Sequence, residues 1–366
     1  MVLNWRFTEQ QIPRAAGRID QAQIKDGTLS IAGWMLLPSR LCSPPSLFIN
    51  GTLFARTEQR QRPDVHEAHP WIDHAGLSGF AYSGSAEGIA SCESFTIELV
   101  LFEDSFPCGY LATLVKTESI PPKKEEHPPL ELIRQIGAPD VESFEAQGLK
   151  VLTDFVQAIQ LSRGLPNTRR VLDWGCGCGR VSSPFSVFFP DVELFGSDIA
   201  ENCVDWCRIH LHSSRFVKSA LFPPLPFADS SFDVVLASSV MTHLKRTVQL
   251  VWLQEMNRVL GPGGLLLASV LGDYAFKREQ AVKPEARSRL YNDCNSLVAR
   301  TLLAFRGICD RTPNEGLAGK IPAGYYMNVF QTEKYTRAAW SQHFEVLRYI
   351  ERGMDNYQDL VVLRKP

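Results

Sequence analysis

The stretch "VLDWGCGCGR", residues 171–180, constrains the fold of this chain more than any other part of the sequence. Gly175, Gly177 and Gly179 alternate directly after a short apolar run that ends near Asp173. Glycine weakens a strand and costs roughly 1 kcal/mol relative to alanine inside a helix. A strand that ends in glycines and continues into a helix instead leaves bare backbone and free N–H groups for a ligand. The stretch therefore predicts a nucleotide-cofactor turn.

A carboxylate follows this turn at the spacing that a nucleotide site requires. Asp198, in the stretch "LFGSDIA", lies nineteen residues beyond Gly179, where a second strand is expected to end. There its carboxylate can accept hydrogen bonds from ribose hydroxyls. Two cofactor classes fit this arrangement, dinucleotides and S-adenosylmethionine.

Two features separate these cofactor classes. The glycines alternate at every second position, whereas dinucleotide turns follow the pattern G-x-G-x-x-G. Near the C-terminus, the strand-like runs "FEVLRYI" and "DLVVLRK" are separated only by "ERGMDNYQ". Because parallel strands need a longer crossover, this pair is expected to be antiparallel, whereas a dinucleotide fold would continue with a second parallel half. Both features favour S-adenosylmethionine.

Four stretches carry a resemblance to a known family. "VLDWGCGCGR", "FGSDIA", "LPFADSSFDVVLASSVMTHL" and "RVLGPGGLLLASV" resemble, in order and spacing, the signature motifs of class I S-adenosylmethionine-dependent methyltransferases. The alternation of strands and helices around them is typical of a doubly wound parallel sheet. The resemblance covers residues 131–366 and implies an α/β fold, a Rossmann-like seven-stranded sheet with an antiparallel terminal strand. It also implies S-adenosyl-L-methionine as cofactor and methyl transfer as the reaction.

The resemblance assigns roles to the residues of the glycine turn. Asp173 and the backbone of Gly175, Cys176 and Gly177 are expected to line the methionine and ribose portion of the cofactor. Gly179 is expected to let the following helix pack closely on the strand. A tight structural turn without a ligand is the alternative for these glycines.

The resemblance assigns further contacts beyond this turn. Asp198 is expected to hold the ribose, and Ile199 to lie against the adenine. The carbonyl groups near Ala237 and Ser238, at the end of the fourth strand, are expected to approach the methionine amino group. One departure from the family is the stretch "KSALFPPLPF", which lacks the acidic residue that binds the adenine amino group in many members. Backbone groups or Ser219 would have to make that contact.

His243 is the candidate general base for the methyl acceptor. It follows the fourth strand, on the side where the reactive methyl group is expected, and an unperturbed histidine pKa near 6.5 suits proton removal. The alternative is a histidine that only braces the start of a helix.

The candidate acceptor contacts come from a long insertion, residues 272–343, between the fifth and sixth strands. Its stretch "IPAGYYMNVFQTEKY" contains Tyr325, Tyr326 and Asn328, and the turn "GMDNYQD" at the same edge contributes Gln358. Such side chains can stack on a sugar ring and bond its hydroxyls. Ordinary buried tyrosine packing is the alternative.

The first third of the chain predicts a different domain. Short β-rich runs recur about every ten residues, and Asn50-Gly51 between two of them is a strong hairpin signal. We expect a β-sandwich accessory domain over residues 1–117, a proline-rich linker over residues 118–130, and the methyltransferase domain over residues 131–366. The first of these resembles small β-domains found beside methyltransferases and glycosyltransferases of surface-polysaccharide pathways, which favours a sugar or glycan hydroxyl as the acceptor.

Composition limits the partners. The formal charge is −2, from 38 basic and 40 acidic residues, so no overall field attracts nucleic acid. No apolar run is long enough to span a membrane, and the N-terminal stretch lacks a secretory pattern. The nine cysteines are scattered without paired metal-ligand spacing, which predicts reduced thiols, no metal site and a cytoplasmic protein.

Three functional hypotheses remain open on the sequence. The leading one is an O-methyltransferase that acts on a sugar or glycan. The second is methylation of a small metabolite or natural product, and the third is a non-catalytic protein that only binds the cofactor. The oligomeric state is not predicted.

Overall fold

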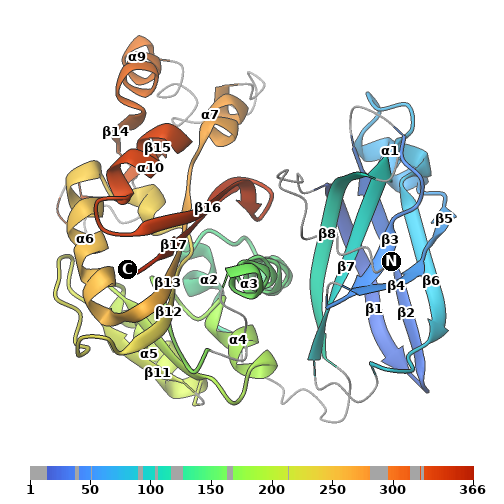
Figure 1. Cartoon of the computed structure of the whole chain (residues 1–366), viewed down its shortest axis with the longest axis horizontal. Helices are drawn as coiled ribbons and strands as arrows, with labels where there is room; N and C mark the ends of the chain where they lie inside the picture. The colour runs from blue at the N-terminus through green and yellow to red at the C-terminus, as the bar shows by residue number, and fades with distance from the viewer. Residues whose placement is uncertain are drawn as a thin grey trace. The chain divides into compact units, whose positions relative to one another are not determined.

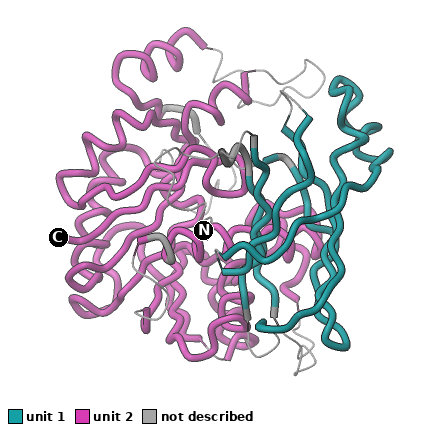
Figure 2. The backbone as a smooth tube through the Cα atoms, turned by 45° about the vertical axis from the view of Figure 1, so that its right-hand side comes forward, with its two compact units in different colours: residues 1–125 teal, residues 126–366 magenta. Residues whose placement is uncertain are grey.

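The computed structural model describes residues 15–37, 41–50, 52–89, 94–103, 106–116, 127–162, 168–212, 214–280, 296–313, 322 and 325–366. The chain divides into two compact units, residues 1–125 and 126–366 (Figure 2). Most of the expected linker, residues 118–126, and three parts of the expected insertion, residues 281–295, 314–321 and 323–324, lie outside the described residues.

The first unit contains two four-stranded antiparallel sheets. One sheet has the order β1 (Ala16–Lys25), β2 (Thr28–Leu36), β6 (Gly79–Ser85) and β5 (Glu58–Arg60). The other has the order β4 (Thr52–Arg56), β3 (Ser46–Ile49), β7 (Ser94–Glu103) and β8 (Phe106–Lys116). Two short helical segments, α1 (Pro63–Ala68) and η2 (Ala75–Leu77), precede β6.

Sequence alternation explains how these sheets pack. Along β2 every second residue is buried, so one face is apolar. Ile31 of one sheet and Leu47 and Leu99 of the other belong to the same buried cluster. The β1–β2 connection is tight because Asp26 and Gly27 both take positive φ angles, of 49° and 73°, as two-residue hairpin turns require.

The second unit is built on a seven-stranded sheet of order β11-β10-β9-β12-β13-β17-β16. Its strands are β9 (Arg170–Trp174), β10 (Glu193–Asp198), β11 (Arg215–Lys218), β12 (Phe232–Ala237), β13 (Leu260–Val270), β16 (Glu345–Met354) and β17 (Gln358–Arg364). The first five in the sheet order are parallel, whereas β17 runs antiparallel to both β13 and β16. The expected seven-stranded Rossmann-like sheet with its antiparallel C-terminal pair is therefore confirmed.

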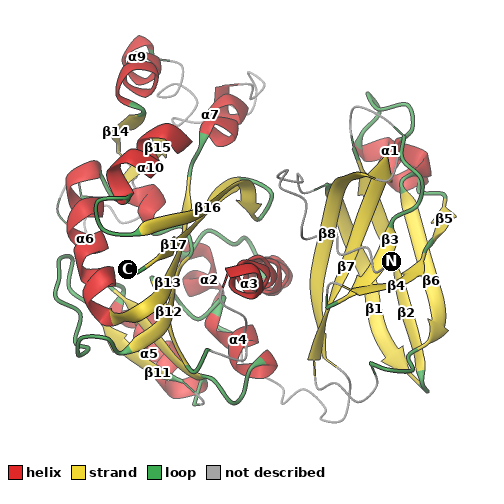
Figure 3. Ribbon diagram, viewed as in Figure 1, coloured by secondary structure: helices red, strands yellow, loops and turns green. Residues whose placement is uncertain are grey.

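Helices lie on both sides of this sheet, with α3 and α6 on opposite sides (Figures 1 and 3). The helices before β13 are α2 (Leu130–Gln135), α3 (Val141–Ser162), α4 (Ser182–Phe188), α5 (Glu201–His210) and α6 (Arg246–Val259), with a 3-10 turn, η4 (Met241–His243). In α6 the residues Val248, Trp252 and Met256 recur at four-residue steps and are buried, which gives the helix one apolar face. Among the described helices, none is long and apolar enough to cross a membrane.

The expected insertion has secondary structure of its own. It contains α7 (Asp273–Gln280), α9 (Leu297–Arg306), β14 (Ile308–Pro313), β15 (Met327–Gln331) and α10 (Glu333–Trp340), and β14 pairs with β15 in an antiparallel sheet. Isolated bridges join Tyr326 to Leu244 and Phe330 to Leu271. The insertion is thereby held beside η4 and the end of β13.

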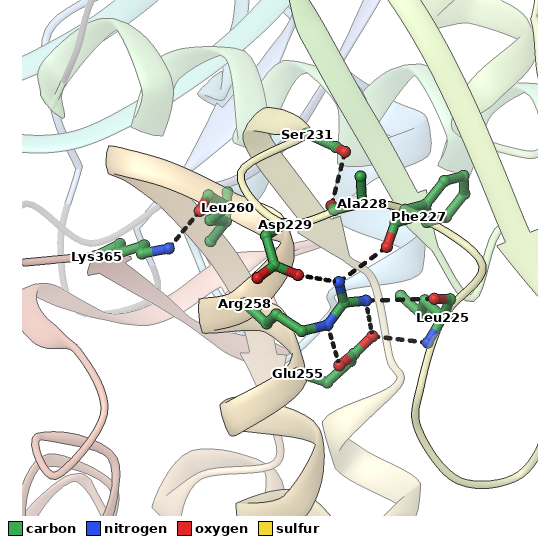
Figure 4. Close-up of polar contacts among 9 residues, drawn as sticks. All are labelled: Leu225, Phe227, Ala228, Asp229, Ser231, Glu255, Arg258, Leu260 and Lys365. Atoms are coloured by element: carbon green, nitrogen blue, oxygen red, sulfur yellow. Dashed lines mark hydrogen bonds and ion pairs between the residues drawn. The ribbon is translucent and has the colours of Figure 1, made fainter.

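Hydrogen bonds and ion pairs of a single arginine fix the loop between β11 and β12 (Figure 4). Arg258 of α6 donates to Glu255, to Asp229 and to the carbonyl oxygens of Leu225 and Phe227. Glu255 in turn accepts from the Leu225 backbone at 2.6 Å. The Glu255 side chain is only 6% exposed and that of Arg258 is 29% exposed, so the carboxylate of this ion pair is buried and its arginine is partly buried.

Candidate functional site

The three glycines of the turn have the backbone that only glycine adopts readily. Gly175, Gly177 and Gly179 have φ angles of 79°, 53° and 86°. A Cβ on Gly175 would lie 2.3 Å from Val240, and one on Gly177 would lie 2.9 Å from Ile136. These contacts explain why the chain carries no side chain here.

Gly179 differs in detail from the expectation. A Cβ at this position would lie 2.6 Å from Leu211 and 3.4 Å from the Cys207 sulfur, which are at the end of α5. The close approach is therefore made by α5 and not by α4, the helix that directly follows the turn.

Asp198 lies where the sequence places it, at the end of β10 beside the glycine turn. Its Oδ2 accepts from the Gly177 backbone N–H and its Oδ1 from that of Ala200, both at 2.8 Å. Burial raises the pKa of this carboxyl, although the two backbone donors favour its charged form. The turn and the carboxylate thus form one fixed unit.

A cavity of about 490 Å³ opens in front of this unit. It is lined by many of the expected residues: Gly175, Gly177, Asp198, Ile199, Ser238, His243, Tyr325 and Tyr326. Ser219, the alternative adenine contact, also lines it. The volume and the mixed polar and apolar lining suit a nucleoside-sized ligand.

Four expected cofactor residues are not among the described residues that line this cavity: Asp173, Cys176, Gly179 and Ala237. Asp173 is buried behind the turn, where its Oδ2 accepts from the Ser182 hydroxyl at 2.6 Å. Burial raises the Asp173 pKa to about 6. Its side chain therefore ties the turn to the first residue of α4, and its expected contact with the ligand stays a prediction.

Cys176 and Ala237 are also placed inside the fold. The Cys176 sulfur would lie 3.0 Å from a Cβ on Gly196 of the neighbouring strand, so the thiol packs beneath the turn. Ala237 is fully buried at the end of β12. The following residue, Ser238, is the one that reaches the cavity.

Sequence reasoning missed several lining residues. Trp174, within the glycine motif itself, packs against Trp252 of α6 with ring centroids 4.8 Å apart, and both line the cavity. Arg134 and Gln135 of α2 line it as well. The short α2 has no sequence signal that points to a ligand, whereas the tryptophan beside Gly175 could have been noticed.

A second cavity of about 300 Å³ meets the first. The expected acceptor residues Asn328 and Gln358 line the second cavity, whereas Tyr325 and Tyr326 line the first. Five residues line both cavities: Ile136, Arg180, Ser238, Ser239 and His243. We call this set the shared wall.

Hydrogen bonds fix the groups around the shared wall. The Gln358 amide donates to the Ser239 hydroxyl at 2.8 Å, and the Ser239 backbone N–H donates to Ser269 at 2.7 Å. Tyr325 is less available, because its hydroxyl bonds to the Leu221 carbonyl and accepts from Trp252 at 3.4 Å. These contacts fit the alternative interpretation of Tyr325, that of a tyrosine packed inside the fold.

His243 has a defined orientation in the shared wall. Its Nδ1 lies 3.0 Å from the Met327 carbonyl oxygen, and its ring stacks on Tyr326 with centroids 4.2 Å apart. A carbonyl only accepts, so Nδ1 carries the proton and Nε2 carries the lone pair. Burial lowers the His243 pKa to about 4, below the value near 6.5 expected from the sequence, so the ring is neutral at physiological pH but is a weaker base than an exposed histidine.

Comparisons with known proteins relate part of this chain to methyltransferases. Residues 171–264 match the family model described as a methyltransferase domain. A malonyl-[acyl-carrier protein] O-methyltransferase of Legionella pneumophila is 32% identical over 114 residues, which are 31% of this chain and 39% of that protein. An uncharacterized methyltransferase of Schizosaccharomyces pombe is 25% identical over 44% of this chain and 63% of its own length.

A ubiquinone biosynthesis O-methyltransferase of Cereibacter sphaeroides is 33% identical over 28% of this chain and 41% of its own length. This chain thus spans less than two thirds of each of these curated relatives. A solved S-adenosylmethionine-dependent methyltransferase from Mesorhizobium loti covers 58% of this chain and 96% of its own, at 17% identity and a TM-score of 0.39. The segment matched by the family model contains both the glycine turn and Asp198.

Proposed function

We propose that this protein transfers a methyl group from S-adenosylmethionine to a hydroxyl oxygen of a sugar or glycan. The matched methyltransferase domain and the methyltransferase-named relatives support an S-adenosylmethionine-dependent enzyme. The observation that carries the proposal is the shared wall, because a donor in the first cavity would face an acceptor in the second.

The first cavity fits the cofactor. Gly175 and Gly177 leave a cradle that a Cβ would fill, and Asp198 presents a fixed carboxylate for ribose hydroxyls. Ile199 and Ser238 line the same cavity, and we assign Ile199 to the adenine and Ser238 to the methionine portion. When bound, S-adenosylmethionine supplies a methyl group on a positively charged sulfur, which makes it ready for displacement.

The protein's own part is to align an acceptor and to receive its proton. His243 is neutral at physiological pH, and its Nδ1 hydrogen bond to Met327 leaves the lone pair on Nε2. In our proposal Nε2 would accept the proton of the acceptor hydroxyl as that oxygen takes the methyl group, with the sulfur–carbon bond of the donor broken and S-adenosylhomocysteine as the leaving group. The stacked Tyr326 ring keeps the imidazole in this orientation.

The second cavity has the side chains that recognise hydroxyl groups. Ser239, Thr242, Asn328 and Gln358 line it, together with Gln147 of α3. Hydroxyls and amides can both donate and accept, which matches a polyol such as a sugar ring. This composition supports the sugar or glycan acceptor over a purely apolar one.

The names of two relatives favour a second candidate within the same reaction class. Both are O-methyltransferases, one of malonyl-[acyl-carrier protein] and one of ubiquinone biosynthesis. Methylation of an oxygen on a small metabolite is therefore the alternative to a glycan. The non-catalytic hypothesis lacks such support, because the glycine turn, Asp198 and an oriented His243 all occur together.

We further propose the domain organisation that goes with this function. Residues 1–117 would form the β-sandwich accessory domain, residues 118–130 the linker, and residues 131–366 the methyltransferase domain with its insertion at 272–343. The six cysteines described with their side chains form no disulfide with one another, and we propose a cytoplasmic location for the protein.

The test is transfer of labelled methyl from S-adenosylmethionine to a panel of sugars, phenols and acyl carriers. At saturating cofactor, His243→Gln is expected to lower turnover at least tenfold without weakening cofactor binding. His66→Gln, in the first unit, is the matched control and is expected to leave turnover unchanged. A loss below tenfold for His243→Gln would remove it as the base, and transfer only to non-sugar acceptors would exclude the glycan.

A further inference from the structure

Arg180 is a cation of the shared wall that the proposed reaction does not use. It directly follows the glycine turn and lines both cavities. Among the described residues that line the second cavity, it is the one with a permanent positive charge. His243, the other basic side chain of that lining, is neutral.

The guanidinium of Arg180 makes neutral contacts within the protein. Its Nη1 donates to the Gln147 side-chain oxygen at 3.1 Å and to the Ile136 carbonyl oxygen at 3.5 Å. Within the described part of the chain, no carboxylate oxygen lies within ion-pair distance of it, and Nε and Nη2 have no hydrogen-bond partner. Burial lowers the pKa of Arg180, and the electrostatic attraction of Asp355, Cys178 and Asp173 offsets this desolvation only in part.

The largest acidic influence on Arg180 comes from a carboxylate that is already paired with another cation. Asp355, in the turn between β16 and β17, lines the second cavity and attracts Arg180 electrostatically. Its Oδ1, however, lies 2.6 Å from the Lys150 ammonium nitrogen. The positive charge of Arg180 therefore remains available to a ligand.

One hydrogen bond and one electrostatic influence draw the guanidinium to the acceptor side. Gln147, which accepts from it, and Asp355, which attracts it, line the second cavity and are not among the described residues that line the first, whereas Ile136 lines both. The hydroxyl and amide groups of Ser239 and Gln358 belong to the same cavity. An acceptor here would meet the planar guanidinium of Arg180 together with groups that bind hydroxyls.

We propose that Arg180 binds an anionic group of the methyl acceptor, a carboxylate or a phosphate, so that the substrate is an acidic hydroxylated molecule such as a sugar acid or sugar phosphate. The acceptor assignment rests on the proposed function, whereas the anion site rests on Arg180 and its contacts. A bidentate pair with Nε and Nη2 would satisfy the donors that lack partners.

Pairs of probes that differ in charge test the anion site separately from the sugar assignment. The protein, loaded with S-adenosylhomocysteine, is titrated with glucose, glucuronate and glucose 6-phosphate, and with phenol and 4-hydroxybenzoate. Dissociation constants are measured for the wild type, Arg180→Gln and Arg337→Gln. Arg337 is an exposed residue of α10 paired with Glu333, so its variant removes one positive charge away from the cavities.

We expect the wild type and Arg337→Gln to bind glucuronate or glucose 6-phosphate at least tenfold more tightly than glucose. In Arg180→Gln this preference is expected to fall below threefold, with the affinity for S-adenosylhomocysteine changed less than threefold. Equal binding of charged and neutral sugars by the wild type would overturn the anion site while leaving the sugar proposal intact.

Three other results are informative. A charge preference confined to the phenol pair would support the anion site and overturn the sugar. A loss of S-adenosylhomocysteine affinity above tenfold in Arg180→Gln would overturn the proposal, because Arg180 would then hold the cofactor's carboxylate. Absence of binding by every probe would overturn both the anion site and the sugar assignment.

Discussion

The two cavities that meet at the shared wall are built in different ways. One side of the first cavity, proposed for the cofactor, is the short segment 171–200, in which glycine backbone and one carboxylate bond to each other directly. The second cavity, proposed for the acceptor, collects single side chains from α3, η4, β15 and the β16–β17 turn. The turn side of the first cavity is therefore local and set by backbone geometry, although α2, α6 and the insertion complete its lining, whereas the second cavity depends on long-range packing throughout. Variants that separate local from long-range effects test this difference.

The largest effect is expected for Arg258, whose ion pair with Glu255 holds the loop between β11 and β12. Arg258→Ala would leave Glu255 buried and unpaired and would free the loop whose Leu221 carbonyl accepts from Tyr325. We expect a loss of about 3–5 kcal/mol in the free energy of unfolding, measured by urea denaturation. Arg337→Ala, which breaks an exposed pair, is the control and should cost less than about 1 kcal/mol. Similar losses for both variants would contradict this role.

The next effect concerns the pH dependence of His243. Its folded pKa of about 4 lies below the ordinary value of 6.5, so the unfolded chain binds the proton more tightly. The stabilising contribution of the neutral ring is present above pH 6.5 and is lost as the pH falls toward 4, by up to about 3 kcal/mol. Unfolding free energies of the wild type and His243→Gln at several pH values measure the difference. A difference that does not vary between pH 7 and pH 4 would show that the ring is not buried in its neutral form.

A glycine pair isolates the backbone effect in the cofactor cavity. Gly175 and Gly263 both have positive φ, of 79° and 70°, but a Cβ on Gly263 meets nothing within 4 Å. Gly263→Ala should cost about 1 kcal/mol from backbone strain alone. Gly175→Ala should cost about 1–3 kcal/mol more, because its Cβ collides with Val240, and should weaken S-adenosylhomocysteine binding at least tenfold. Equal losses of stability and of S-adenosylhomocysteine affinity in the two variants would show that the close approach of Val240 to Gly175 is unimportant.

The smallest effect is expected for one side chain of the acceptor cavity. Gln358→Ala removes the hydrogen bond to Ser239 and one group for an acceptor hydroxyl. We expect the acceptor KM to rise about fivefold, or about 1 kcal/mol, with the cofactor affinity unchanged. Steady-state kinetics and calorimetry measure both quantities. A change in cofactor affinity instead would mean that the two cavities are not separately built.

The same difference explains what the sequence could predict. The glycine spacing and the distance to Asp198 are local patterns, and the short connection before β17 left no room for a crossover helix, so the sheet and its cofactor edge were predictable. Asp173 was assigned to the ligand although its carboxylate bonds to Ser182 behind the turn. Whether the Asp173 carboxylate faces the ligand or Ser182 depends on the tertiary packing of α4. The contribution of Arg180 and Gln147 could not be predicted, because it requires knowing that α3 lies beside the turn.

The central claim is that the glycine turn and Asp198 together hold S-adenosylmethionine. Calorimetric titration of the wild type, Asp198→Ala and the exposed control Asp205→Ala with this cofactor tests it most directly. The wild type and Asp205→Ala should bind with micromolar dissociation constants, and Asp198→Ala should bind at least 100-fold more weakly, about 2.7 kcal/mol. Wild-type protein that binds no S-adenosylmethionine, or Asp198→Ala that binds it as tightly as the wild type, would contradict the account.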